Sequence, residues 1–320
     1  MKRSVTVHAP CRLHFGMFSF GHADLAQFGG VGAMVDPPAV KVSIIPADSF
    51  AVVAERALAR RVRQLVDTLT DAWQLPETPR CEIEVDSPAS HSGLGVGTQL
   101  ALSVAAGLRR MLELPDQSLE ALADATGRGM KSAVGTYGFQ QGGLIVDAGK
   151  TPGQTLGTLS VWAALPEAWR FVLICPQDEQ GLAGESEVKA FARLPPVPLE
   201  TTRALWRITH EELLPAVESR DLAAFGEAVF QFGRRAGECF APVQGGSFAT
   251  PEIARLINSL RDKEVFGVGQ SSWGPTIFAL APDDEAASRL ASWLRATSPS
   301  QSLEVTIAKP SNRGAAIDFK

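Results

Sequence analysis

The sequence predicts an α+β fold, and three observations lead to that prediction. Short stretches with apolar residues at every second position indicate strands, and longer stretches with apolar residues three or four apart indicate helices. The two kinds do not alternate regularly, which is typical of α+β rather than α/β proteins. The chain has 320 residues, of which 45% are hydrophobic, so it has length for two domains and a sizeable core.

Strand-like stretches occur along the whole chain. In residues 81–86, Ile83 and Val85 alternate with acidic residues, which is the period of a strand with one buried face. The predicted strands cover residues 3–9, 39–45, 81–86, 142–147, 169–175, 265–268, 276–281 and 303–308.

Helical patterns lie between these strands. The apolar residues after Thr98 are spaced for one buried helix face, and they are Leu100, Val104, Leu108 and Met111. The predicted helices cover residues 53–72, 98–112, 117–126, 185–193, 200–218, 221–236, 250–262 and 284–296.

A break in the pattern suggests where one domain ends. Leu165-Pro166-Glu167 directly precedes the strand expected at 169–175. We therefore predict two domains, residues 1–165 and residues 166–320.

Composition excludes several classes of function. A net charge of −5 with mixed signs argues against nucleic acid as a partner. No window reaches the roughly 18 apolar residues of a membrane span. The start lacks an apolar signal core, so we expect a cytoplasmic protein. The four cysteines and five histidines are scattered, which predicts reduced thiols and no zinc site.

The most informative motif is Ser92-Gly93-Leu94-Gly95-Val96-Gly97-Thr98-Gln99, between the strand at 81–86 and the helix at 98–112. Glycine lets the backbone approach a ligand closely, and the first turn of a helix presents unpaired N–H groups with partial positive charge. The motif therefore predicts a phosphate site, and the structural alternative is a plain strand-to-helix turn.

Two common phosphate motifs do not match. A P-loop needs a lysine after its last glycine, and none follows Gly97. A dinucleotide-binding fingerprint needs Gly-x-Gly-x-x-Gly and a second strand, whereas the spacing here is Gly93-x-Gly95-x-Gly97 and another helix follows.

The segment Pro88-Ala89-Ser90-His91-Ser92-Gly93-Leu94-Gly95 resembles the second motif of the GHMP small-molecule kinases. That motif has a proline, three residues and then Gly-Leu-Gly-Ser-Ser. This chain has one more residue after the proline, and Val96-Gly97-Thr98-Gln99 replaces the serine pair. In the kinases a serine there helps to bind magnesium, so the replacement argues against phosphoryl transfer from ATP.

Segments along nearly the whole chain resemble one branch of that superfamily, the β-ribofuranosylaminobenzene 5′-phosphate synthases. The Gly-Thr-Gln run at 97–99 and Gly269-Gln270-Ser271-Ser272-Trp273-Gly274-Pro275 are specific to the branch. The chain departs from it at 127–132 and at Lys150, which stands where a histidine is common. The other matching segments are Arg12-Leu13-His14-Phe15-Gly16, Phe28-Gly29-Gly30-Val31-Gly32, Gln141-Gly142-Gly143-Leu144-Ile145-Val146-Asp147, Gly181-Leu182-Ala183-Gly184-Glu185-Ser186-Glu187 and Gln244-Gly245-Gly246.

The resemblance implies a two-lobed GHMP kinase-like fold, with an N-terminal lobe similar to ribosomal protein S5 domain 2 and a ferredoxin-like C-terminal lobe. It implies a magnesium-dependent glycosyltransferase, often dimeric. The enzyme would join phosphoribosyl pyrophosphate to 4-aminobenzoate or 4-hydroxybenzoate, release CO2 and pyrophosphate, and begin (tetrahydro)methanopterin biosynthesis.

Candidate site residues follow from the motifs together with the resemblance. Arg12, His14 and Glu185 are candidate catalytic residues, Thr98 and Asp147 are candidate magnesium ligands, and five residues are candidate substrate contacts: Gly29, Gly30, Gln270, Ser271 and Ser272. The expected pyrophosphate-binding residues are His91, Ser92, Gly93, Leu94, Gly95, Val96, Gly97, Thr98 and Gln99.

Structural roles remain open for several of these residues. Arg12 is equally suited to an ion pair between strands, and a histidine in an apolar run such as His14 is often a satisfied core residue. Acids at a helix start, such as Glu185, favour the helix dipole, and Asp147 suits a turn cap. His91 also suits a turn cap, and residues 270–272 suit a tight β-turn.

Two other functions stay open. A GHMP-type kinase acting on a small alcohol or phosphate ester would use the Gly-Leu-Gly loop for ATP. A non-catalytic sensor of a phosphorylated ligand would keep the fold and lose the chemistry, and the departures at 127–132 and Lys150 motivate it.

Overall fold

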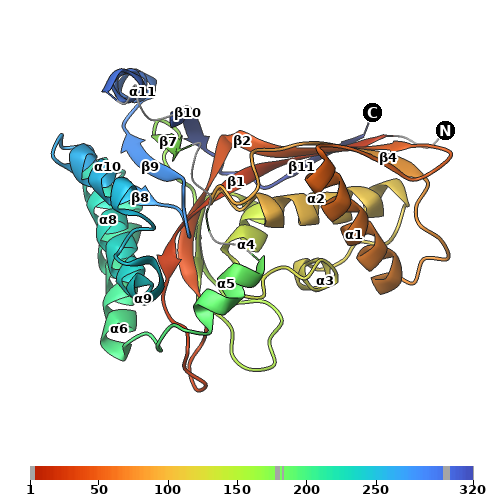
Figure 1. The fold of residues 1–320 in the computed structure, drawn as a ribbon, viewed down its shortest axis with the longest axis horizontal. Helices are drawn as coiled ribbons and strands as arrows, with labels where there is room; N and C mark the ends of the chain where they lie inside the picture. The colour runs from red at the N-terminus through yellow and green to blue at the C-terminus, as the bar shows by residue number, and fades with distance from the viewer. Residues whose placement is uncertain (1–3, 177–180, 182–183, 298–302, 320) are drawn as a thin grey trace.

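A long antiparallel hairpin forms the centre of the fold. The computed structural model describes residues 4–176, 181, 184–297 and 303–319. Strand β1 (Val5–Met17) pairs with β2 (Gly30–Pro46) along its length, from Val5 opposite Ile44 to Met17 opposite Gly30. On its other side β1 pairs with β11 (Ala316–Phe319), which brings the two ends of the chain together (Figure 1).

Strand β2 has three successive partners on the side away from β1. Its end pairs with β4 (Cys81–Asp86), and its start pairs with β5 (Leu144–Asp147). Between these, Val35 and Asp36 pair with the end of β10. Two short strands complete this sheet, β3 (Ala51–Val53) beside β4 and β6 (Leu159–Ala163) beside β5.

The second half of the chain adds four strands in the order β10, β7, β9, β8. Apolar side chains of α10 and α11 pack with one face of this group, where Ile257, Ala291 and Ile277 are fully buried. The strands are β10 (Leu303–Pro310), β7 (Arg170–Pro176), β9 (Ile277–Ala281) and β8 (Gly269–Gln270).

Helices gather in two groups, and α5 lies between them in the view of Figure 1. The N-terminal group lies beneath the first sheet and comprises α1 (Arg56–Ala72), α2 (Val96–Met111), α3 (Leu119–Ala125) and α4 (Val134–Gln141). The remaining helices are α5 (Gly184–Phe191), α6 (Leu199–Arg207), α7 (Leu214–Glu218), α8 (Leu222–Glu238), α9 (Ala241–Gln244), α10 (Pro251–Arg261) and α11 (Asp284–Thr297). A π-helical segment, Ile208–Leu213, joins α6 to α7. Among the described residues, no helix is both long and apolar enough to cross a membrane.

The fold class is confirmed as α+β, and several elements differ from their predicted bounds. The strand predicted at 265–268 is wrong, because Gly267 has φ +58 there and the strand comes later, at Gly269–Gln270. Strands β1 and β2 are longer than predicted. The elements that were not predicted are β3, β6, β11, α4 and α9. The helix predicted at 200–218 contains the π-helical segment.

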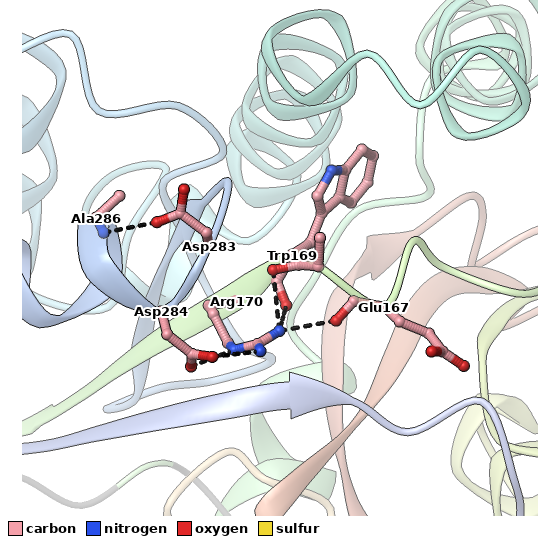
Figure 2. Close-up of polar contacts among 7 residues, drawn as sticks. Glu167, Trp169, Arg170, Asp283, Asp284 and Ala286 are labelled. Atoms are coloured by element: carbon pink, nitrogen blue, oxygen red, sulfur yellow. Dashed lines mark hydrogen bonds and ion pairs between the residues drawn. The ribbon is translucent and has the colours of Figure 1, made fainter.

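Arg170 ties the start of β7 to the start of α11 (Figure 2). Its Nε and Nη2 donate to the two carboxylate oxygens of Asp284, each at 2.6 Å. Its Nη1 donates to three successive backbone carbonyls, those of Glu167, Ala168 and Trp169. Charged hydrogen bonds are stronger than neutral ones. The Arg170 side chain therefore holds the start of β7, the segment before it and the start of α11 together.

Candidate active site around the glycine loop

The glycine loop adopts the strand-to-helix turn that the sequence predicts. Gly95 is the N-cap residue of α2 at φ +69, and no side chain caps this helix end. Gly93 also has positive φ, at +87, so both glycines occupy a region that side chains with a β-carbon rarely adopt. The first turn of α2 therefore presents its amide groups at the loop without a competing polar side chain.

Arg12 reaches the loop from β1. Its backbone N–H donates to the carbonyl of Leu94 at 2.9 Å, and a β-carbon at Gly95 would lie 3.0 Å from its Nε. Its Nε and Nη1 are buried and have no hydrogen-bond partner. Burial lowers the pKa of Arg12 to about 10, and the charge of Glu187 opposes that shift. A buried cation with unpaired donors beside a phosphate-type loop is suited to an anionic ligand.

His14 lies two residues further along β1, where it is 4% exposed. Its Nε2 lies 3.0 Å from Oγ of Ser132, in the segment before α4. Burial first, and then the charge of Arg12, lower the pKa of His14 well below 6.5. At neutral pH the ring is therefore uncharged, with one ring nitrogen able to donate a hydrogen bond and the other able to accept one.

Asp147, at the end of β5, is fully buried beside Ser132. Its Oδ2 accepts from the backbone N–H of Ala133 at 2.7 Å, and its Oδ1 accepts from that of Gly149 at 2.8 Å. Burial raises the pKa of Asp147 to about 6, while these bonds and the Ser132 hydroxyl act in the opposite direction. The contacts favour the capping role, and the role as a magnesium ligand stays a prediction. No group of three metal-ligating side chains was found among the described residues.

Ser271 joins the second half of the chain to the loop. Its Oγ donates to the carbonyl of Gly93 at 2.7 Å and accepts from the backbone N–H of His14 at 3.0 Å. Ser272 has φ +56, and its backbone N–H donates to the carbonyl of His14. The segment 270–276 is thus a tight turn, as the structural alternative had it, and the turn is packed directly against the loop.

Other predicted contacts have structural partners. Gln270 accepts from Ala249 N–H at 2.7 Å and donates to the Ser272 carbonyl at 2.9 Å. A β-carbon at Gly29 would lie 2.5 Å from the Asp147 carbonyl oxygen, and one at Gly30 would lie 3.2 Å from Cε1 of His14. Because the Gly16 carbonyl oxygen would be nearer still, at 2.3 Å, Gly30 is required by the close packing of β1 on β2 beside the His14 ring. The substrate roles of these three residues stay predictions.

Of the polar residues of the loop, Gln99 and Ser92 are buried, whereas His91 and Thr98 are accessible. Gln99 is fully buried and its Nε2 donates to the carbonyl of Gly135 at 2.8 Å, which ties α2 to α4. Ser92 is buried, and its Oγ has no partner. His91 is exposed, and Thr98 is half-buried in the first turn of α2. Burial and then the charge of Arg61 lower the pKa of His91.

Glu187 of α5 contacts two residues that lie beside the site, Lys131 and Trp273. Lys131 Nζ pairs with its Oε1 at 3.0 Å, and Trp273 Nε1 donates to the same oxygen at 3.2 Å. The ring of Trp273 lies edge-on to Phe240 at 4.8 Å between centroids. These aromatic rings line a small cavity together with His14, Phe15, Gly237 and Ser272. The side chain of Glu185, a predicted catalytic residue, lies outside the described part of the structure.

The structure thus brings Arg12, His14, the loop and the 270–272 turn together, and it adds residues that sequence reasoning did not select. Ser132 contacts the predicted residue His14 directly, and Glu187 contacts Trp273, the neighbour of the predicted residue Ser272. The only sequence signal for Ser132 is the basic, glycine-containing run at 127–132, in which it is the last residue.

Comparison with solved structures and known families gives the fold a name. A family model described as GHMP kinases C terminal matches residues 213–299. Homoserine kinase from Cytophaga hutchinsonii superposes with a TM-score of 0.70 at 17% identity, covering 99% of this chain and 98% of that one. The chain has the GHMP kinase fold.

Within the GHMP fold, mevalonate-3-kinase from Thermoplasma acidophilum is also similar, with a TM-score of 0.66 at 13% identity over 99% of both chains. At such identities these neighbours show the fold alone. The sequence is more similar to proteins named β-ribofuranosylphenol 5′-phosphate synthase, which confirms the resemblance drawn from the motifs. The one from Archaeoglobus fulgidus is 28% identical over 98% of this chain and 99% of its own length. The one from Methanothermobacter thermautotrophicus is 28% identical over 87% and 88%.

Proposed function

We propose that this protein is a phosphoribosyl-transferring, decarboxylating synthase. It joins phosphoribosyl pyrophosphate to a para-substituted benzoate and forms a β-ribofuranosyl arene 5′-phosphate, as the first step of a methanopterin-type pathway. The name of its relatives contains a phenol, so 4-hydroxybenzoate is the first acceptor to test, and 4-aminobenzoate is the second.

The proposed reaction balances without an oxidant or reductant. The bond between the anomeric carbon and the pyrophosphate oxygen breaks, and pyrophosphate leaves with that electron pair. The ring carbon that bears the carboxylate forms the new bond to the anomeric carbon. The bond to the carboxylate then breaks, CO2 leaves, and its electron pair restores the aromatic ring. Catalysis requires stabilisation of the departing diphosphate and positioning of the two reactants.

Two guanidinium nitrogens of Arg12, Nε and Nη1, are buried without a hydrogen-bond partner against Gly95, and they carry the proposal. A preorganised cation next to helix N–H groups stabilises negative charge as it develops on a departing diphosphate. His14 lies two residues away on the same strand, uncharged at neutral pH, and we assign it to a hydrogen bond with the arene or its para group. The cavity lined by His14, Phe240 and Trp273 offers an aromatic surface for that arene.

Magnesium fits this site only if substrate oxygens supply most of its ligands. The described residues hold no cluster of carboxylates for it, and both Asp147 oxygens accept backbone N–H groups. Thr98, half-buried in the first turn of α2, is the protein hydroxyl we propose as a ligand. When bound, the ion neutralises charge on the leaving pyrophosphate.

The kinase alternative has less support. Val96-Gly97-Thr98-Gln99 replaces the serine pair of the kinases, and the amide nitrogen of Gln99 donates to the Gly135 carbonyl rather than to a ligand. The solved kinases share the fold at identities too low to carry over their substrates. The sensor alternative predicts ligand binding without turnover.

A CO2-release assay separates the three functions. Purified protein is incubated with phosphoribosyl pyrophosphate, Mg2+ and carboxyl-labelled 4-hydroxybenzoate or 4-aminobenzoate. Labelled CO2 together with pyrophosphate supports the synthase. Absence of both products from folded protein overturns it, and formation of ADP from ATP with a small alcohol then supports the kinase. We also propose a homodimer, which light scattering after size-exclusion chromatography tests.

A further inference from the structure

A second group of basic side chains lies beside the glycine loop and has no role in the proposal above. Arg61 of α1 faces the first turn of α2, since a β-carbon at Gly97 would lie 2.5 Å from its Nη2 and 3.4 Å from its Cζ. Arg128, in the segment after α3, has a buried Nε with no hydrogen-bond partner. Both are half-buried, and the described part of the chain gives neither an ion pair, which is unusual for buried cations.

The two arginines line one cavity of about 340 Å³. Its polar lining also includes Gln64, Thr68 and Thr126, and Gly97 contributes the backbone of α2. This volume is within the range of small-molecule sites, roughly 300–1,000 Å³. The cavity therefore has room for a phosphate group and the atoms that carry it.

The charges in this cavity repel one another. Burial, followed by the charge of Arg61, lowers the pKa of Arg128 to about 10, and burial also lowers the pKa of Arg61. Asp124 lines the cavity but is exposed, and the described residues include no ion pair between it and either arginine. A pair of desolvated cations is unfavourable unless an anion joins them, and guanidinium groups match phosphate oxygens in pairs.

The position of the pair relative to Arg12 indicates which anion. Arg12 contacts the loop at Gly95, and Arg61 contacts it at Gly97, two residues further into α2. The two cationic positions therefore lie at the first turn of the same helix, and a diphosphate is an anion with two phosphate groups for two such positions. His91, at the loop, is also within the influence of the Arg61 charge.

We propose that Arg61 and Arg128 form a subsite for the distal phosphate of a diphosphate whose proximal phosphate lies at the Gly93–Gly97 loop beside Arg12. The inference rests on the proposed function for the identity of the diphosphate, which is the pyrophosphate part of phosphoribosyl pyrophosphate. The subsite holds the leaving group and leaves the 5′-phosphate to bind elsewhere.

Calorimetry with inorganic pyrophosphate and Mg2+ tests the subsite without any turnover. Arg61→Gln and Arg128→Gln are each expected to weaken pyrophosphate binding about tenfold or more. Arg60→Gln is the matched control, because Arg60 is the exposed neighbour on the same helix and loses the same charge. Ribose 5-phosphate is the second ligand, and its affinity is expected to change by less than about twofold in all three variants.

Thermal unfolding supplies a second readout and checks that the variants fold. Without ligand, Arg61→Gln and Arg128→Gln are expected to melt at or above the wild-type temperature, because each relieves repulsion. Pyrophosphate is expected to raise the melting temperature of wild type and Arg60→Gln more than that of either variant.

Three results would overturn the subsite: no pyrophosphate binding by wild type, equal pyrophosphate affinity in all four proteins, or a selective loss of ribose 5-phosphate binding. The outcome is separate from that of the proposed function. Pyrophosphate binding that depends on Arg61, without CO2 release, keeps the subsite and rejects the synthase. CO2 release with normal pyrophosphate binding in both variants keeps the synthase and rejects the subsite.

Discussion

The guanidinium of Arg12 lies against Gly95, where a β-carbon would come within 3.0 Å of its Nε. Arg12 contributes a cation with two buried, unpaired nitrogens. Gly95 leaves space for that cation and is the N-cap residue of α2. Residues 83 positions apart in the sequence thus meet at the proposed anion site, and two of the predictions below test the two residues separately.

Arg12→Gln is expected to lower kcat/KM for phosphoribosyl pyrophosphate about 10- to 100-fold, because it removes charge-assisted bonds worth about 1.5–3 kcal/mol. Arg12→Lys keeps the charge but loses the planar fork, so it is expected to restore only part of the activity. Steady-state kinetics of the CO2-release reaction give both values. Equal activity of Arg12→Gln and wild type would remove Arg12 from the site.

Gly95→Ala is expected to weaken pyrophosphate binding more than it weakens folding. The substitution costs about 1 kcal/mol of stability at a positive φ, and its β-carbon also pushes on Arg12. Gly153→Ala is the matched control, since Gly153 has φ +90 and a β-carbon added there would meet no atom within 4 Å. Calorimetry and urea unfolding separate the two effects, and equal pyrophosphate affinity in both variants would contradict the expectation.

His14 and Asp147 are expected to act on stability in opposite directions as pH changes. The folded pKa of Asp147, about 6, exceeds its ordinary 3.8, so its stabilisation is complete below pH 3.8 and is lost as pH rises through 6. This amounts to about 3 kcal/mol. The folded pKa of His14 is below 6.5, so its contribution is present above pH 6.5 and is lost as pH falls.

The two effects offset one another between about pH 4 and 6. In His14→Gln only the Asp147 effect remains, so stability should fall more steeply with rising pH than in wild type. Urea midpoints measured at intervals from about pH 4 to 7 check this, with the exposed His210→Gln as the control. Parallel curves for wild type and His14→Gln would show that His14 is not held neutral by its surroundings.

Arg170→Lys is expected to destabilise the protein by about 2 kcal/mol, because lysine cannot replace the Nη1 bonds to three carbonyls together with the paired Asp284 contact. Arg289→Lys is the control, since its ion pair with Glu285 is exposed and contributes little. Urea unfolding measures both. A loss below about 0.5 kcal/mol in Arg170→Lys would contradict the anchoring role.

Local sequence patterns predicted the backbone shape of the glycine loop, because the loop lies on consecutive residues. The loop at 92–99 needs glycine at positive φ before a helix, and the order of residues in the sequence is enough to indicate this requirement. Arg61 was not predicted, because an arginine on an amphipathic helix looks the same whether it faces water or α2. The role of Gln99 in binding pyrophosphate stays a prediction. Its hydrogen bond to the carbonyl of Gly135, 36 residues away, could not be predicted, because it depends on the packing of α2 on α4.

Local sequence patterns also led to the wrong prediction of a strand at 265–268. Its apolar residues fit a strand, but Glu264 and Gly267 have φ of +58, which turns the backbone away from an extended course. Strand β11 was not predicted, because its four residues are mostly exposed and show no alternating apolar pattern. They form a strand only through their hydrogen bonds to β1. The division at residue 165 stays a prediction.

Strand β2, with its three successive partners, has a consequence for how the protein unfolds. It joins β5, β10 and β4 along one edge, so it belongs to the sheets of both halves. The largest apolar cluster likewise includes Leu13 from the first half and Phe171 and Phe225 from the second. Neither half can lose its structure without exposing apolar surface of the other. The chain should therefore melt as one cooperative unit, with a single calorimetric transition.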